Sequence, residues 1–146
     1  MRVALNQGIY VLVCPLGEGL LGRWVAELRL IQIRWGLTRG ERIAVLAHEF
    51  VHAAAGHRGP QSPEVEAWVD AVAARWLIPD WEWDYVRGLR GGDLDCVAVR
   101  LGVPRWLVTA FQRAMREFKA FAVSPLLDFI KSRTVDCNSD EAERPP

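Results

Sequence analysis

Residues 46–57, LAHEFVHAAAGH, contain all three histidines of the chain. His48 and His52 are four residues apart, so on a helix they share one face, about 6 Å apart along the axis. Both imidazole rings can then converge on one ion. Glu49 lies about 100° further round the helix, which puts its carboxylate beside that ion, where a general base for water must sit. The pattern therefore predicts two metal ligands and a catalytic base.

A third ligand is needed to separate this reading from a chance HExxH on a surface helix, because catalytic zinc takes three protein ligands. His57 is a poor choice, being five residues after His52 and close to the helix end. In the following segment, Glu66 and Asp70 are four residues apart on one helical face. We expect Glu66 to bind the metal and Asp70 to accept the other N–H of a ligating histidine. The alternative is a solvated acidic face, like that of Glu64.

Capping signals bound the two helices that carry these residues. Thr38 and Glu41 in TRGE form a capping box, and Gly56 can end the first helix after about residue 55. Ser62 and Pro63 open the second helix, which should end before residue 79. The alanines on the face of Glu66 and Asp70 would allow these two helices to approach closely.

The rest of the chain divides into an N-terminal β region and a helical C-terminal half. The first 36 residues contain three β-rich runs, IYVLV, GRWVAEL and RLIQIRW. A substrate strand could pair with LRLIQIRW if that strand lies at a sheet edge, but the same strand fits a buried position equally well. Helices are expected from Asp80, on either side of a hinge at Gly102, and after Ser124. In DWEWDY, core packing of the aromatic residues is favoured over a peptide-binding patch.

Length and composition indicate one globular domain over residues 1–133, followed by a polar tail at 134–146 that we expect to be disordered. With 18 basic and 18 acidic residues, the net charge of zero gives no reason to expect direct binding of nucleic acid or an anionic membrane. The three cysteines are odd in number and widely spaced, which is typical of reduced thiols in a cytoplasmic protein. No apolar stretch approaches the roughly 20 residues of a spanning helix.

LAHEFVHAAAGH followed by VEAWVDAVAARWLIP resembles the ImmA/IrrE family of small metallopeptidases, and the similarity covers roughly residues 25–80. VAVRLGVPRWLV resembles a later segment of that family more loosely. The resemblance implies an α+β, zincin-like minimal gluzincin fold, with a small twisted sheet beside two active-site helices. It also implies that His48, His52 and Glu66 bind one zinc ion and that Glu49 is the acid and base. Val72 and Asp70 depart from the family pattern, at positions where it has Phe and Asn.

The expected function is therefore zinc-dependent hydrolysis of peptide bonds in a protein substrate. Tyr85 and His57 are the candidates for the donor that stabilises the oxyanion. Members of the resembled family are linked to removal of a DNA-binding repressor in mobile elements or stress responses. A helix-turn-helix repressor encoded nearby is thus the expected substrate.

Two alternatives remain open at this point. One is a metal-binding regulatory module with little or no proteolytic activity, and the other is a DNA-binding switch that uses the turn at Gly102. Glu49 favours the enzyme over the regulatory module, since a structural metal site has no need of a base.

Overall fold

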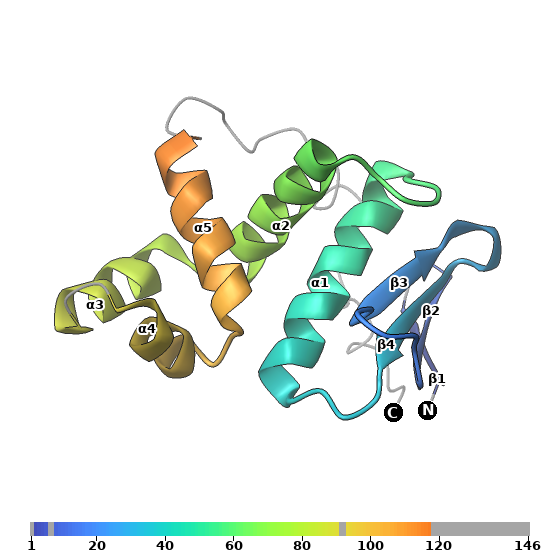
Figure 1. Ribbon diagram of the computed structural model, residues 1–146, viewed down its shortest axis with the longest axis horizontal. Helices are drawn as coiled ribbons and strands as arrows, with labels where there is room; N and C mark the ends of the chain where they lie inside the picture. Colours follow the sequence, from blue (N-terminus) through green and yellow to red (C-terminus); the bar gives the residue numbers. More distant parts are fainter. Residues whose placement is uncertain (1, 6–7, 91–92, 118–146) are drawn as a thin grey trace, which may run out of the picture. The chain divides into compact units, whose positions relative to one another are not determined.

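In the computed structural model the chain is an α+β protein, with an N-terminal sheet followed by helices (Figure 1). The structure describes residues 2–5, 8–90 and 93–117. The helix expected after Ser124, the domain end at residue 133 and the tail at 134–146 lie outside the described residues. Among the described helices, none is both long enough and apolar enough to cross a membrane.

The sheet has four strands in the order β1-β2-β4-β3. They are β1 (Arg2–Leu5), β2 (Ile9–Cys14), β3 (Gly22–Val25) and β4 (Leu30–Arg34). β2 and β4 are parallel, whereas β1 and β3 pair antiparallel to their neighbours. The strand in RLIQIRW is therefore interior, so the buried interpretation of this strand is confirmed and the edge interpretation is wrong.

Two details of the β region differ from the sequence prediction. Strand β1 was not predicted. The run GRWVAEL is strand only through Val25, since residues Ala26–Leu28 form a single 3₁₀ turn, η1. Alanine, glutamate and leucine favour helical over extended backbone, which accounts for the early end of the strand.

The two helices predicted around the site begin and end as their capping residues indicate. Helix α1 (Arg39–Ala55) follows Thr38, whose hydroxyl accepts from the backbone N–H of Glu41, and the Glu41 carboxylate accepts from that of Thr38. Gly56 ends α1 with a φ of 73°. Helix α2 (Pro63–Leu77) follows Ser62, whose hydroxyl accepts from the Val65 N–H.

Helix α1 lies between the sheet and α2 (Figure 1). Its apolar face packs on the sheet, in a core of one helical and four strand residues: Ile9, Val11, Ile31, Ile33 and Val45. The side of α2 that is buried carries small residues, Val69 and 71–74. Because these side chains are short, the backbones of α1 and α2 approach closely enough for polar residues on the two helices to meet.

Three further helices form the C-terminal part of the described chain. They are α3 (Asp80–Arg90), α4 (Leu94–Leu101) and α5 (Arg105–Glu117). Trp83 is buried and packs on Phe111 of α5 at a ring-centroid distance of 5.0 Å. Trp81 and Tyr85 are 71% and 59% exposed, so core packing of the DWEWDY aromatics is confirmed only for Trp83. Trp81 and Tyr85 lie on the side of α3 opposite Trp83, away from the core.

The start of β3 approaches α1 so closely that a side chain at Gly22 would not fit. A Cβ atom there would lie 2.4 Å from Cγ1 of Val45 and 2.8 Å from Oε1 of Glu49. Gly17, in contrast, has nothing within 4 Å of its Cβ position.

We therefore expect Gly22→Ala to lower the free energy of unfolding by about 1–3 kcal/mol, the usual cost of overpacking. The matched variant Gly17→Ala should leave it unchanged or slightly higher. Urea denaturation of the full chain measures both. Equal midpoints for the two variants would show that β3 is not held against α1 in this way.

Candidate metal centre

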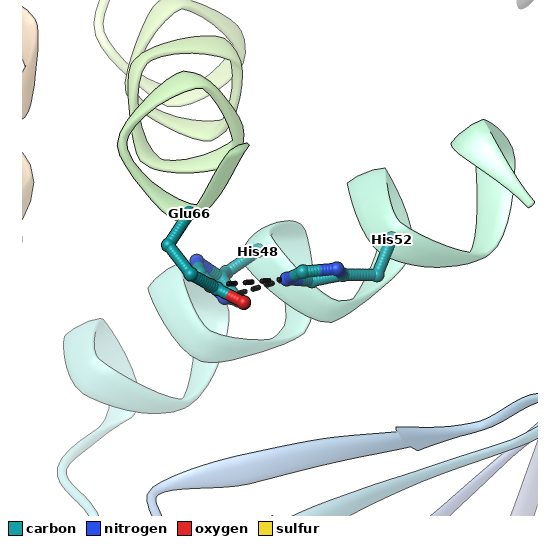
Figure 2. Close-up of side chains that lie close together, drawn as sticks. All are labelled: His48, His52 and Glu66. Carbon is teal, nitrogen blue, oxygen red and sulfur yellow. Dashed lines mark hydrogen bonds and ion pairs between the residues drawn. The ribbon is translucent and has the colours of Figure 1, made fainter. Parts of the chain in front are cut away.

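His48, His52 and Glu66 converge on one point between α1 and α2 (Figure 2). The Nε2 atoms of the two histidines lie 3.0 Å apart. Oε2 of Glu66 lies 3.3 Å from Nε2 of His48 and 3.4 Å from Nε2 of His52. These are the three residues that the sequence nominates as ligands, and the structure brings them together.

Local sequence explains how the three side chains meet. His48 and His52 are one turn apart on α1, so their rings point to the same side. Glu66 lies in the first turn of α2, four residues after the cap at Ser62. Because Ser62 sets the start of α2 and the small residues set its distance from α1, the Glu66 carboxylate meets both rings.

The spacing of the three atoms fits a metal ion. In a tetrahedral site with bonds of about 2.0–2.2 Å, ligand atoms lie about 3.3–3.6 Å apart. The observed separations of 3.0, 3.3 and 3.4 Å are close to this. Two imidazole nitrogens and one carboxylate oxygen are also a donor set that suits zinc and similar transition metals. The group could therefore bind a metal ion.

Asp70 contacts the ring nitrogen of His48 that faces away from the centre. Its Oδ1 lies 2.8 Å from Nδ1 of His48. A carboxylate can only accept, so Nδ1 carries the hydrogen and donates it, and in the neutral ring Nε2 presents a lone pair to the centre. This is the contact expected of Asp70, and it orients the ligand as well as selecting its tautomer.

His57 occupies the corresponding place behind His52. Nδ1 of His57 lies 3.0 Å from Nδ1 of His52, and the backbone N–H of His57 donates to the His52 carbonyl at 3.0 Å. The left-handed conformation of Gly56 folds the chain back to allow both contacts. The sequence offers His57 as a candidate oxyanion donor, which stays a prediction; in the structure its Nδ1 lies toward His52.

Metal binding by His52 would fix which ring nitrogens of His52 and His57 carry hydrogen. For Nε2 of His52 to present a lone pair, its Nδ1 must carry the hydrogen and donate it to Nδ1 of His57. His57 then holds its own hydrogen on Nε2. A further bond holds His57 in place, because the indole Nε1–H of Trp24 in β3 donates to the His57 carbonyl at 3.2 Å. If His52 binds a metal ion, the side chain of His57 would orient its ring.

Glu49 lies beside the three ligands and is only 7% exposed. Burial raises the pKa of the Glu49 carboxyl above its ordinary value, against the opposing effects of the His48 charge and a hydrogen bond from the backbone of Trp24. A carboxylate with a raised pKa is a stronger base, as proton transfer near neutral pH requires.

The pKa values of His48 and His52 are shifted in opposite directions from their ordinary value. Burial lowers the pKa of His48, but the hydrogen bond to Asp70 and the charges of Glu49, Asp70 and Glu66 outweigh burial, so its pKa is raised. Burial and the charge of His48 lower the pKa of His52. As pH falls, His48 takes up the first proton of the pair, and protons then compete with a metal for this centre.

A pocket of about 300 Å³ opens beside the centre. It is lined by the loop before β3, one face of α1, and one residue each from α2 and α5: Gly19, Leu20, Leu21, Gly22, Val45, His48, Glu49, Asp70 and Trp106. The rings of Trp106 and His48 are nearly perpendicular, with an interplanar angle of 87° and centroids 6.3 Å apart. Sequence reasoning missed Trp106 and the loop, since neither carries a motif. Tyr85, the other nominated oxyanion donor, is exposed on α3 and is not among the lining residues.

Comparison with known proteins adds evidence about the fold alone. No model of a known protein family matches the chain, and no curated protein sequence does. A solved structure, the "Mycobacterium tuberculosis transcriptional regulator", is similar with a TM-score of 0.52 and 18% sequence identity. The similar region covers 72% of this chain and 36% of that one, so the chain spans little more than a third of its length. At this identity the likeness supports a shared arrangement of elements.

Glu66→Ala should remove most bound metal, because it takes away one of three ligands. Glu64→Ala is the matched control, as Glu64 lies two residues earlier on α2 and is exposed. Zinc content of the purified full-length variants, measured by atomic emission, checks this. Equal zinc in the two variants would mean that Glu66 is not a ligand.

His57→Ala should weaken zinc binding by about 10- to 100-fold, as loss of an orienting partner usually does. His57→Asn, whose amide can accept the same hydrogen, should recover part of the loss. A competition titration against a chromophoric chelator measures the affinity, and the visible spectrum of the cobalt-loaded chain reports ligand geometry. Unchanged affinity and spectrum in His57→Ala would show that His52 needs no partner.

Proposed function

We propose that this chain is a zinc-dependent endopeptidase of the gluzincin type, with one zinc ion per chain and a fold of the zincin class. The observation that carries the proposal is the buried Glu49 carboxylate, beside three convergent ligands and facing an open pocket. Zinc is the proposed metal because a catalytic zinc site combines two histidines and one glutamate and leaves one position open.

When bound, zinc would lower the pKa of a water molecule and polarise the carbonyl of the peptide bond. Glu49 then takes a proton from that water and delivers it to the leaving amine, as its raised pKa favours. His48, His52 and Glu66 would hold the zinc ion. Asp70 and His57 keep the two imidazole rings turned toward it. No described residue is assigned to the oxyanion.

The edge strand β3 provides a place for an extended substrate. Strand β3 lies against α1. One edge of β3 pairs with β4, and the other edge has no neighbouring strand in the described sheet. An added strand there would pass close to Glu49, because Gly22 and Glu49 are in near contact. The edge strand proposed for substrate pairing is thus β3 in place of the interior LRLIQIRW.

The proposed substrate is a regulatory protein, a helix-turn-helix repressor encoded near this gene, cut in an exposed linker in the cytoplasm. This part of the proposal rests on the resemblance to the ImmA/IrrE family. The main alternative, a metal-binding regulatory module without hydrolysis, keeps the ligands but gives no role to Glu49. Burying a carboxylate that binds no metal costs stability. A catalytic base explains why Glu49 is buried here, whereas a regulatory module without hydrolysis does not, so the burial favours the enzyme.

Glu49→Gln should keep zinc, because Glu49 is not a ligand, and should lower hydrolysis at least about 100-fold. Co-expression with the neighbouring repressor, followed by mass spectrometry of the repressor, measures cleavage. Glu64→Gln is the control for a charge change of the same kind. Cleavage by Glu49→Gln at the wild-type rate would contradict the mechanism. An intact repressor and an uncut peptide library with the zinc-loaded wild type would favour the regulatory module.

A further inference from the structure

Helix α3 has an inward face that packs in the core and an outward face that does not. Trp83 and Val86 lie on the inward face and are only 2% and 3% exposed. Trp81 and Tyr85 lie on the outward face, 71% and 59% exposed, and are one helical turn apart, about 6 Å along the axis. None of these four residues lines the pocket beside the metal centre. The outward face is therefore a surface separate from that site.

The two outward aromatic rings do not contribute to the core. The inward face already fills the core position of α3, with Trp83 packed on Phe111 of α5. A single exposed aromatic residue is ordinary, but Trp81 and Tyr85 are neighbours on one helical face and together expose a continuous apolar stripe. A partner that covered both rings would remove this apolar area from water, which favours association.

Acidic side chains flank the aromatic stripe. At about 100° per residue, Glu82 lies to one side of the stripe and Asp84 to the other. Among the described residues, no ion pair involves Glu82 or Asp84, whereas Asp80 at the start of the helix pairs with Arg75. The exposed Arg87 lies more than about 100° round the helix from either aromatic ring. The stripe is therefore bordered by two carboxylates without a countercharge.

Aromatic rings next to carboxylates suit a cation. The faces of indole and phenol rings attract a guanidinium or ammonium group, and a carboxylate beside them supplies the countercharge. The same carboxylates would repel an anionic partner such as the phosphates of a nucleic acid. The surface made of Trp81, Glu82, Asp84 and Tyr85, which we call the α3 face, therefore fits a basic partner.

The backbone of α3 favours a helix over an extended peptide as that partner. An extended peptide binds where its backbone N–H and C=O groups find partners, as at a sheet edge. The backbone groups of α3 are bonded within the helix, so the α3 face offers no such pairing. A helix satisfies its own backbone, and its side chains one turn apart match the spacing of Trp81 and Tyr85. Gly88, on the same face, has nothing within 4 Å of its Cβ position, which leaves room for close approach.

We propose that the α3 face docks a helix of the protein substrate that carries arginine or lysine side chains one turn apart. The inference rests on the proposed function for the identity of this partner. A helix-turn-helix repressor presents arginine and lysine side chains to DNA, so the α3 face and DNA would compete for the same cations. Docking at this face adds specificity for one protein without using the metal centre.

Titration of the full chain with three alanine-based helical peptides tests the surface without hydrolysis. The first peptide carries two arginines four residues apart, the second carries them two residues apart, and the third carries leucines at the positions of the first. Backbone amide chemical shifts, measured by NMR, report where each peptide binds and how tightly. The first peptide should shift the amides of α3 and bind at least about threefold more tightly than the others, because only its two cations share one side of a helix.

Variants of the full chain locate the binding. Trp81→Ala should weaken binding of the first peptide about two- to fivefold, the size of one exposed cation–π contact. Trp35→Ala removes a tryptophan that is 67% exposed directly after β4, and as the matched control it should change nothing. Asp84→Asn should make the affinity less dependent on salt, since it removes a countercharge, whereas Glu18→Gln, at an exposed loop position, should not.

The repressor itself tests the identity of the partner. Trp81→Ala should raise KM for its cleavage about two- to fivefold and leave kcat unchanged, because the α3 face lies outside the metal centre. Operator DNA in excess should displace the repressor from the Glu49→Gln chain, which binds without cutting.

Several results would overturn the inference. They are equal affinity of the two arginine peptides, tightest binding of the leucine peptide, shifts confined to residues outside α3, and an unchanged KM in Trp81→Ala. A dimer of the free chain that dissociates in Trp81→Ala, measured by sedimentation, would make a second copy the occupant and also overturn it. An uncut repressor together with α3-specific binding of the first peptide would instead refute the proposed function, and the partner's identity with it, while the α3 face remains a site for a basic helix.

Discussion

The burial of Glu49 and His52 is the constraint on which the rest of the site depends. Each is 7% exposed, and they are the buried polar residues among those that the structure describes. A buried charge or imidazole without partners would cost several kcal/mol, so α1 can be covered on this side only if its neighbours supply those partners. Glu66 supplies one from α2, His57 another from the turn after α1, and β3 a third through the backbone of Trp24. The tertiary arrangement around α1 therefore provides partners for polar groups that the HExxH pattern makes unavoidable.

The partners on the two sides of the metal centre are unequal. Nδ1 of His48 faces the Asp70 carboxylate, and the pKa of His48 is raised, whereas Nδ1 of His52 faces the His57 ring, and the pKa of His52 is lowered. His48 is thus the more basic of the two imidazoles, and His52 takes up a proton at lower pH than His48. The Asp70 carboxylate keeps the hydrogen on Nδ1 of His48 and so leaves the lone pair on its Nε2. Glu49, Glu66 and Asp70 together bring three carboxylates to the centre.

Local features of the sequence were enough to predict the two helices α1 and α2 and the three residues that converge between them, because the causes are local. Thr38, Ser62 and Gly56 act within one turn of the residues that they cap, and the spacing of His48 and His52 depends only on helix geometry. Strand order depends on pairing between distant residues, so the interior position of β4 was open until the structure placed β3 outside it. Trp106 lies 58 positions after His48 and carries no motif. The role of His57 was hidden for a different reason, since a five-residue spacing misleads unless the left-handed turn at Gly56 is taken into account.

Two glycine contacts explain how a site with residues from distant segments can be held rigidly. Gly22 brings the start of β3 against the Val45 and Glu49 side chains in the middle of α1, and Gly40 brings the start of α1 against the backbone of Gly102 in the turn before α5. A methyl group at either position would have to displace the neighbouring segment, and with it one side of the pocket. The two glycines thus connect the stability of the fold to the dimensions of the site.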